Sequence, residues 1–143
     1  MTFNLKEWIN KVTNIFANEK PSYVQFTDRN TADSTTTTST TGAVITSVTH
    51  TSKTGLVFVF GQATLKTSAN TTRLSVFRGS TNVLTSVTNN TASTPMVVAG
   101  VVTSPKGVAT TFTLNHIPQS GATSTLIRYQ QYRIVVVDIP TYS

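Results

Sequence analysis

Apolar residues near the start of the chain recur at helical spacing. Their steps of three and four residues place them on one face of a helix over residues 4–17. Asn4 can cap this helix, Glu7 follows at the capping-box spacing, and Pro21 ends the pattern. The sequence therefore predicts a short amphipathic helix. Its apolar stripe comprises Leu5, Trp8, Ile9, Val12, Ile15 and Phe16.

A threonine-rich stretch follows this helix. Residues 34–41 are all serine or threonine, a low-complexity composition that is typical of a linker. We expect an anchor helix over residues 1–20 and a Thr-rich linker over residues 21–42, with a short extended piece at Tyr23–Phe26. A helix of about 14 residues is marginal alone in water, so its stripe needs a partner surface. The long tether favours docking on another chain, and the alternative is packing on the protein's own β-domain.

From residue 43 onward the period of the pattern changes to two. Alternating apolar and polar residues at roughly even spacing, separated by turn residues, predict antiparallel strands in a sandwich or barrel. Gly79, Ser80 and Thr81 give a hairpin signal, and Ser104–Gly107 gives a turn with proline at its second position. The predicted strands are Ala43–His50, Gly55–Lys66, Thr72–Arg78, Asn82–Thr88, Met96–Thr103, Val108–Ile117 and Thr125–Ile139.

One of these strands is apolar on both faces. Such a strand lies centrally in a sheet or at a contact between subunits. We predict that it forms a contact between subunits, where apolar surface on both sides is buried. The residues of this predicted subunit contact are Leu56, Val57, Phe58, Val59 and Phe60.

Acidic residues are almost missing from the predicted β-domain. The chain carries a net charge of +6, and residues 34–137 contain no carboxylate. Catalysis by paired carboxylates is therefore nearly excluded, and a Ser–His–Asp triad would have to combine His50 or His116 with Asp138. We expect both histidines to be exposed residues at strand ends, and we expect neither catalytic residues nor a metal site nor a cofactor.

The basic residues of the β-domain are dispersed along the chain. Lys66, Arg73 and Arg78 lie near one predicted strand and could form an anion-binding face. The alternative is that they only provide solubility and scattered subunit contacts. No aromatic-interleaved RNA-binding pattern occurs, which makes nucleic acid a poor candidate partner.

Composition adds constraints on class and location. Only 11% of the 143 residues are charged, threonine and serine together account for close to a third of the chain, and cysteine is absent. The sequence shows neither a signal-peptide pattern nor an apolar run of transmembrane length. We expect a soluble protein made without an export signal and without a membrane partner.

The β-domain resembles the small jelly-roll modules of phage virions, which are the C1q/TNF-like heads of head fibres, tail fibres and baseplate proteins. The residues that carry the resemblance are the apolar strand at 55–61, the hairpin at 74–84 and the closing strand at 132–139, within residues 43–140. The resemblance implies a jelly roll that trimerises, an N-terminal segment that binds other virion proteins, and in some members a host surface glycan. This chain has few aromatic residues outside its strands, which puts a sugar-binding groove in doubt.

Taken together, the sequence predicts an all-β protein. We expect an antiparallel jelly-roll-like sandwich over residues 43–143, preceded by one short amphipathic N-terminal α-helix. The function that we expect is that of a non-enzymatic phage structural protein, attached through its helix and projecting a trimeric knob for capsid or tail decoration or host adhesion. The alternative is a free-standing module that binds carbohydrate or an anionic cell-surface polymer.

Overall fold

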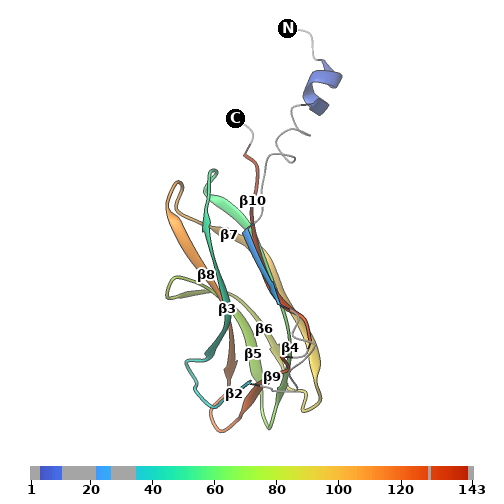
Figure 1. The fold of residues 1–143 in the computed structure, drawn as a ribbon, viewed down its shortest axis with the longest axis vertical. Helices are drawn as coiled ribbons and strands as arrows, with labels where there is room; N and C mark the ends of the chain where they lie inside the picture. The colour runs from blue at the N-terminus through green and yellow to red at the C-terminus, as the bar shows by residue number, and fades with distance from the viewer. Residues whose placement is uncertain (1–3, 11–21, 27–34, 129, 142–143) are drawn as a thin grey trace.

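The computed structural model describes residues 4–10, 22–26, 35–128 and 130–141. Two antiparallel sheets pack face to face and form an elongated sandwich (Figure 1). The chain enters the sandwich and leaves it at the same end, near β1 and β10, and β2 and β9 lie at the opposite end (Figure 1). The predicted fold class, an antiparallel jelly-roll sandwich behind a short helix, is confirmed.

The first sheet is arranged around its longest strand, β4. This strand pairs with β7 along one side and with β10 and then β9 along the other, and β1 and β2 extend the sheet beyond β10 and β9. We call it sheet A. Its strands are β1 (Ser22–Phe26), β2 (Thr35–Thr37), β4 (Leu56–Thr67), β7 (Thr94–Thr103), β9 (Ser124–Leu126) and β10 (Tyr132–Asp138).

The second sheet, sheet B, has the order β3-β8-β5-β6. The predicted hairpin between β5 and β6 is confirmed, since Arg78 pairs with Thr81 across a two-residue turn. Gly79 opens this turn at φ 58°, a conformation that glycine adopts without steric cost. The strands of sheet B are β3 (Ala43–Thr51), β5 (Thr72–Arg78), β6 (Thr81–Thr88) and β8 (Ala109–Pro118).

The core lies between the sheets and consists of the inward-facing alternate residues of both. The sheets pack closely at Gly61, where an added Cβ would lie 2.7 Å from Leu114 Cδ1. Burial of this apolar surface is the main stabilising contribution in a chain without disulfides. The core comprises Val57, Val59, Ala63, Leu65, Leu74, Val76, Met96, Val98, Val102, Phe112, Leu114, Leu126, Tyr132, Ile134 and Val136.

The short extended piece expected at Tyr23–Phe26 is β1, which pairs with β10. Two details of the predicted strand pattern were wrong. The segment 35–37, which we assigned to the linker, is β2 and pairs with β9. The closing strand, predicted as continuous over Thr125–Ile139, is divided into β9 and β10. A turn separates them, in which Ile127 N–H donates to the Thr64 carbonyl and Gln130 N–H donates to the Ile127 carbonyl.

The N-terminal helix is described over residues 5–10. The side-chain Oδ1 of Asn4 accepts a hydrogen bond from the Glu7 backbone N–H at 3.3 Å, so Asn4 caps the helix as predicted. The described part of the apolar stripe faces solvent, with Leu5 58%, Trp8 44% and Ile9 48% exposed. The rest of the predicted stripe lies outside the described residues and comprises Val12, Ile15 and Phe16. Among the described residues, no helix is long and apolar enough to span a membrane.

Candidate functional site

Strand alternation divides the predicted subunit contact between two faces of sheet A. Val57 and Val59 point into the core and are fully buried, whereas Phe58 is 38% exposed on the outer face. The predicted contact was therefore wrong for the two valines, because their side chains are already covered by sheet B. Leu56 and Phe60, which are half-buried, remain candidates with Phe58.

Outward-facing residues of three neighbouring strands extend this surface. Phe58 lies opposite Val101 of β7 and Val137 of β10, and Phe60 lies opposite Ala99 and Val135. Val97 and Val101 are 50% and 60% exposed. We call this surface the sheet A patch. Its residues are Phe58, Phe60, Val97, Ala99, Val101, Val135 and Val137.

A polar boundary limits the sheet A patch toward the β9 end. The Nε of Arg133 donates to Oε1 of Gln62 at 3.1 Å, and its guanidinium lies over the Phe60 ring, 5.1 Å from the centroid. An apolar centre with a polar rim is the usual composition of a protein–protein contact. Sequence reasoning missed Val97, Ala99 and Val101. The alternation of the strand at 94–103 could have placed them on the same face.

Ser22, His50 and Asp138 form a hydrogen-bonded chain between the sheets. His50 Nε2 lies 3.1 Å from Asp138 Oδ1, and His50 Nδ1 lies 2.8 Å from Ser22 Oγ. An ionised carboxylate only accepts hydrogen bonds, so Nε2 carries a proton. In neutral His50, Nδ1 is then the acceptor and the Ser22 hydroxyl donates to it. We call this chain the Ser22–His50–Asp138 relay.

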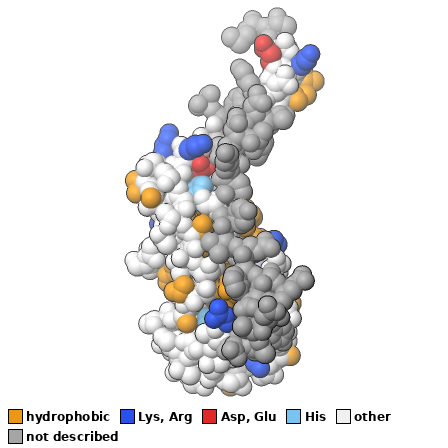
Figure 2. Space-filling model, in the orientation of Figure 1, with side chains coloured by type: hydrophobic (Ala, Val, Ile, Leu, Met, Phe, Trp, Pro, Cys, Tyr) orange, Lys and Arg blue, Asp and Glu red, His pale blue; other side chains and the backbone are white. Residues whose placement is uncertain are grey.

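The relay has the order of donors found in a Ser–His–Asp triad, with the two ring nitrogens interchanged. His50 is 6% exposed and Asp138 is 4% exposed, so the prediction of an exposed His50 was wrong. Because Ser22 and Asp138 belong to sheet A and His50 to sheet B, the relay joins the two layers. Figure 2 shows an acidic side chain (red) and a histidine (pale blue) beside basic side chains (blue) near the upper end of the sandwich.

Asp138 also organises the turn before β4. Its Oδ2 accepts a hydrogen bond from the Lys53 backbone N–H at 2.8 Å. Burial raises the pKa of Asp138, but hydrogen bonds from Lys53 N–H, Ser52 and His50 together hold this pKa below its usual value. A lowered pKa means that the carboxylate stabilises the fold above the ordinary carboxyl pKa. This contribution is lost as the pH falls through the lowered value.

His116 is fully buried in the other half of the sandwich, so its predicted exposure was also wrong. Its Nδ1 lies 2.9 Å from Ser124 Oγ, which in turn accepts from Thr72 Oγ1 at 2.6 Å. Nε2 has no hydrogen-bond partner. Burial lowers the pKa of His116 to about 4, because the charged imidazolium is poorly solvated there. His116 is therefore neutral at pH 7 and packs inside the sandwich.

This shift predicts that acid destabilises the fold through His116. The folded-state pKa is below the unfolded value of 6.5, so the unfolded chain binds more protons between these values and stability falls with the pH. We expect a loss of about 2 kcal/mol between pH 7 and pH 5 from this group alone. Urea unfolding of the wild type and of His116→Gln, followed at both pH values, measures it. A variant with the same pH slope as the wild type would contradict the assignment.

The three predicted anion-binding residues do not share a face. Lys66 is exposed at the outer face of sheet A, and Arg73 projects from the outer face of sheet B. Arg78 crosses to sheet A, where Nη1 donates to the Thr103 backbone carbonyl and, at 2.9 Å, to Thr103 Oγ1. The prediction that these three residues form one anion-binding face was therefore wrong.

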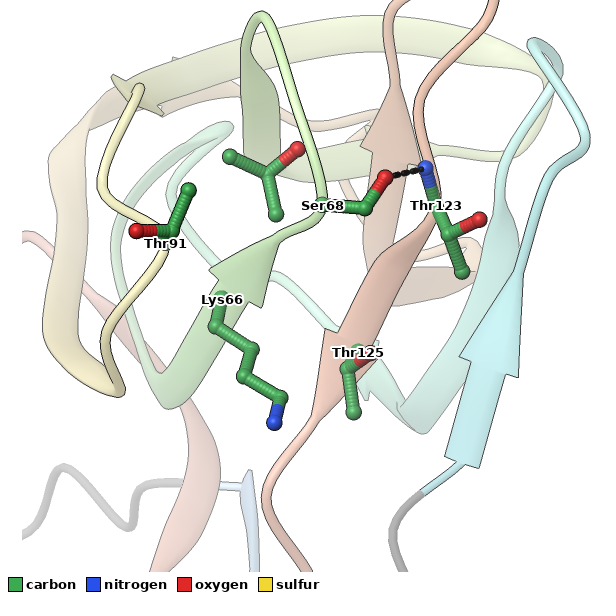
Figure 3. Close-up of a pocket in the computed structure, with 6 residues that line it drawn as sticks. Lys66, Ser68, Thr91, Thr123 and Thr125 are labelled. Atoms are coloured by element: carbon green, nitrogen blue, oxygen red, sulfur yellow. Dashed lines mark hydrogen bonds between the residues drawn. The ribbon is translucent and has the colours of Figure 1, made fainter.

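Lys66 instead lines a pocket with hydroxyl side chains. The pocket has a volume of about 250 Å³ and lies where the ends of β4 and β9 meet the loop between β6 and β7. Figure 3 shows Lys66 and Thr125 on adjacent strands, Ser68 joined to Thr123 by a hydrogen bond, and Thr91 on a separate loop. Of these residues, sequence reasoning named only Lys66, because scattered threonines in a Thr-rich chain carry no signal. The lining residues are Lys66, Thr67, Ser68, Thr91, Thr123 and Thr125.

Comparison with known proteins identifies the fold. No protein-family model and no curated protein match the chain, but 23 chains of solved structures do. One of them is the structure of Eiger TNF from S. frugiperda, with a TM-score of 0.56 and 13% sequence identity, over 87% of this chain and 95% of that chain. The fold is a TNF-like jelly roll. At this identity the similarity concerns the fold alone.

Proposed function

We propose that this chain is a non-enzymatic structural protein of a phage virion. Its N-terminal helix binds another virion protein, and its TNF-like sandwich projects as a homotrimeric knob. The knob decorates and stabilises the capsid or tail, or adheres to the host. The observation that carries this proposal is the sheet A patch, a contiguous apolar surface on the outside of a folded domain.

The sheet A patch supports association of copies of the chain. Folded monomers rarely expose contiguous apolar surface of this kind unless it serves an interaction. Phe60 lies in its middle row, Phe58 and Val101 lie in the next row, and the Arg133–Gln62 pair forms its polar margin. Trimerisation around this face would bury Phe58, Val97 and Val101, and it agrees with the trimeric heads that the sequence resembles.

The helix supports attachment to a different protein. Leu5, Trp8 and Ile9 lie on one face of the described turn and are all exposed. Tryptophan is the side chain most enriched among residues that dominate binding energy, so Trp8 is the expected anchor. In Figure 1 this turn lies beyond the end of the sandwich at which the C-terminus also lies.

The relay supports a structural role over catalysis. Ser22 pairs opposite Val136, whose side chain is in the core, so the Ser22 hydroxyl points between the sheets. His50 is almost fully buried by the same packing. A nucleophile needs a substrate within reach of its oxygen, whereas a bridge between the layers needs only the three side chains. Catalysis therefore has no part in the proposal.

Deletion of residues 1–20 tests attachment. We expect the truncated chain to keep its β-sheet circular dichroism spectrum and to be missing from purified particles, because the helix alone contacts the particle. Trp8→Ala is expected to reduce incorporation at least tenfold, and Asn10→Ala, on the opposite face of the helix, serves as the matched control. Immunoblots of purified particles measure incorporation. Normal incorporation of the truncated chain would overturn attachment through the helix.

A free-standing binding module for carbohydrate or anionic polymer is the second candidate function. The observation that favours it is the hydroxyl-lined pocket that contains Lys66. The two functions differ in whether the protein is present in particles. A mass-spectrometric inventory of purified virions separates them.

A further inference from the structure

The pocket around Lys66 lies at the end of the sandwich that is far from the termini. Lys66 is nine residues along β4 from Val57, which pairs with Asp138 at the other end. A strand rises roughly 3.3 Å per residue, so the two ends of β4 are about 30 Å apart. In a knob attached through residues 1–20, this pocket faces outward. Figure 1 shows β9 at the end opposite the N and C labels.

Several hydrogen-bonding groups of the pocket are free. The hydroxyls of Thr91, Thr123 and Thr125 make no hydrogen bonds with other residues in the described structure. Ser68 Oγ accepts from the Thr123 backbone N–H at 2.9 Å and keeps its own proton as a donor. The lining therefore presents several groups that can both donate and accept, which suits a polyhydroxylated ligand.

The pocket also contains a positive charge that no carboxylate among the described residues compensates. Within the described residues, the one ion pair joins His50 to Asp138, and the Lys66 ammonium has no acidic partner. Asp138 is about 30 Å away, far beyond a Debye length of about 8 Å at physiological ionic strength. The Lys66 ammonium is thus available to an anion held among the hydroxyls.

The backbone around the pocket is fixed before any ligand binds. The Thr67 N–H donates to the Asn90 carbonyl at 3.2 Å, and the Ser68 N–H donates to the Thr123 carbonyl at 3.0 Å. These bonds join the end of β4 to both loops that complete the lining. A preformed site loses less conformational freedom on binding.

We propose that this pocket binds a carboxylated sugar. Its carboxylate pairs with Lys66, and its ring hydroxyls exchange hydrogen bonds with Ser68, Thr123 and Thr125. None of the lining residues is aromatic, so a neutral sugar has no ring to stack on, and charge must supply the selectivity. A single ammonium suits the single charge of a carboxylate. The proposal deepens the proposed host adhesion and rests on attachment at the opposite end.

Titration of the full chain with D-glucuronate tests the pocket. Two-dimensional amide NMR spectra should show shifts concentrated at residues 66–68, 91 and 123–125, with a dissociation constant in the millimolar range. D-glucose and inorganic phosphate at the same concentrations should bind at least tenfold more weakly. Equal binding of glucose would overturn the role of charge, and equal binding of phosphate would overturn recognition of a sugar. If about 20 mM glucuronate caused no shifts, the dissociation constant would be weaker than the millimolar range expected here, and the proposal would be overturned.

Matched variants separate the pocket from general electrostatics. Lys66→Gln should weaken glucuronate binding about tenfold, which is the size of one charge-assisted hydrogen bond. Lys106→Gln removes the same charge from an exposed turn between β7 and β8 and should leave binding unchanged. Equal losses in both variants would mean non-specific attraction and would contradict the proposal. Oligomeric state and particle incorporation are measured separately, so a failure here leaves the proposed trimer and its attachment standing.

Discussion

Val101→Asp is expected to dissociate the proposed trimer and to leave each sandwich folded. Val101 is 60% exposed in the sheet A patch, opposite Phe58, so a monomer tolerates the carboxylate in water. In the trimer the same group is buried without a partner, at a cost of roughly 3 kcal/mol or more. That cost weakens association by about a hundredfold or more. Sedimentation velocity at micromolar concentration measures the change.

Val87→Asp is the matched control for this substitution. Val87 is 56% exposed and pairs with Arg73 on the outer face of sheet B, away from the sheet A patch. We expect this variant to keep the mass of the wild-type assembly. If Val87→Asp dissociated the assembly and Val101→Asp did not, the contact would lie on sheet B. That result would overturn the proposed interface.

Asp138→Ala is expected to have the largest effect on stability among substitutions of polar residues. It removes the only carboxylate between residues 34 and 141, which accepts from His50 and from the Lys53 backbone N–H. The buried His50 ring and the partly buried Lys53 N–H would lose their acceptor, which costs roughly 3 kcal/mol in free energy of unfolding. Urea unfolding at pH 7 and at a fixed protein concentration measures the loss.

Two further substitutions divide this effect between the members of the relay. Asp138→Asn keeps an acceptor oxygen and should lose less stability than Asp138→Ala. Ser22→Ala removes only the outer hydrogen bond to His50 and should lose about 1 kcal/mol. Ordinary surface substitutions change the free energy of unfolding by up to about 0.5 kcal/mol. If the free energy of unfolding of Asp138→Ala differed from that of the wild type by no more than this, the relay would not join the sheets as described.

The fold was predictable because local patterning agrees with it along most of the chain. Alternation of apolar and polar residues located β3 to β8 within one or two residues, and turn residues located the Gly79 hairpin and the Pro105 turn. The pattern failed for strands that are not marked by alternation of apolar and polar residues. β2 is a run of three threonines whose pairing with β9 depends on a neighbour far away in the sequence. The break between β9 and β10 also depends on a group far away in the sequence, the Thr64 carbonyl.

The candidate sites were less predictable than the fold. Periodicity identified the central strand but could not say which of its faces the second sheet covers, so it included Val57 and Val59 with Phe58. The relay joins residues 22, 50 and 138, and the pocket joins residues from three segments. Such groupings exist only after the sheets pack. The cap at Asn4 was predictable because all of its partners lie within one helical turn.

Light scattering on the purified full chain tests the proposed assembly most directly. At micromolar concentration and neutral pH, we predict a single species with three times the chain mass of 15.4 kDa. Val101→Asp, run beside it, should give the mass of one chain. A wild-type protein that remains at 15.4 kDa under these conditions would contradict the central claim, because the sheet A patch would then face water in the folded protein.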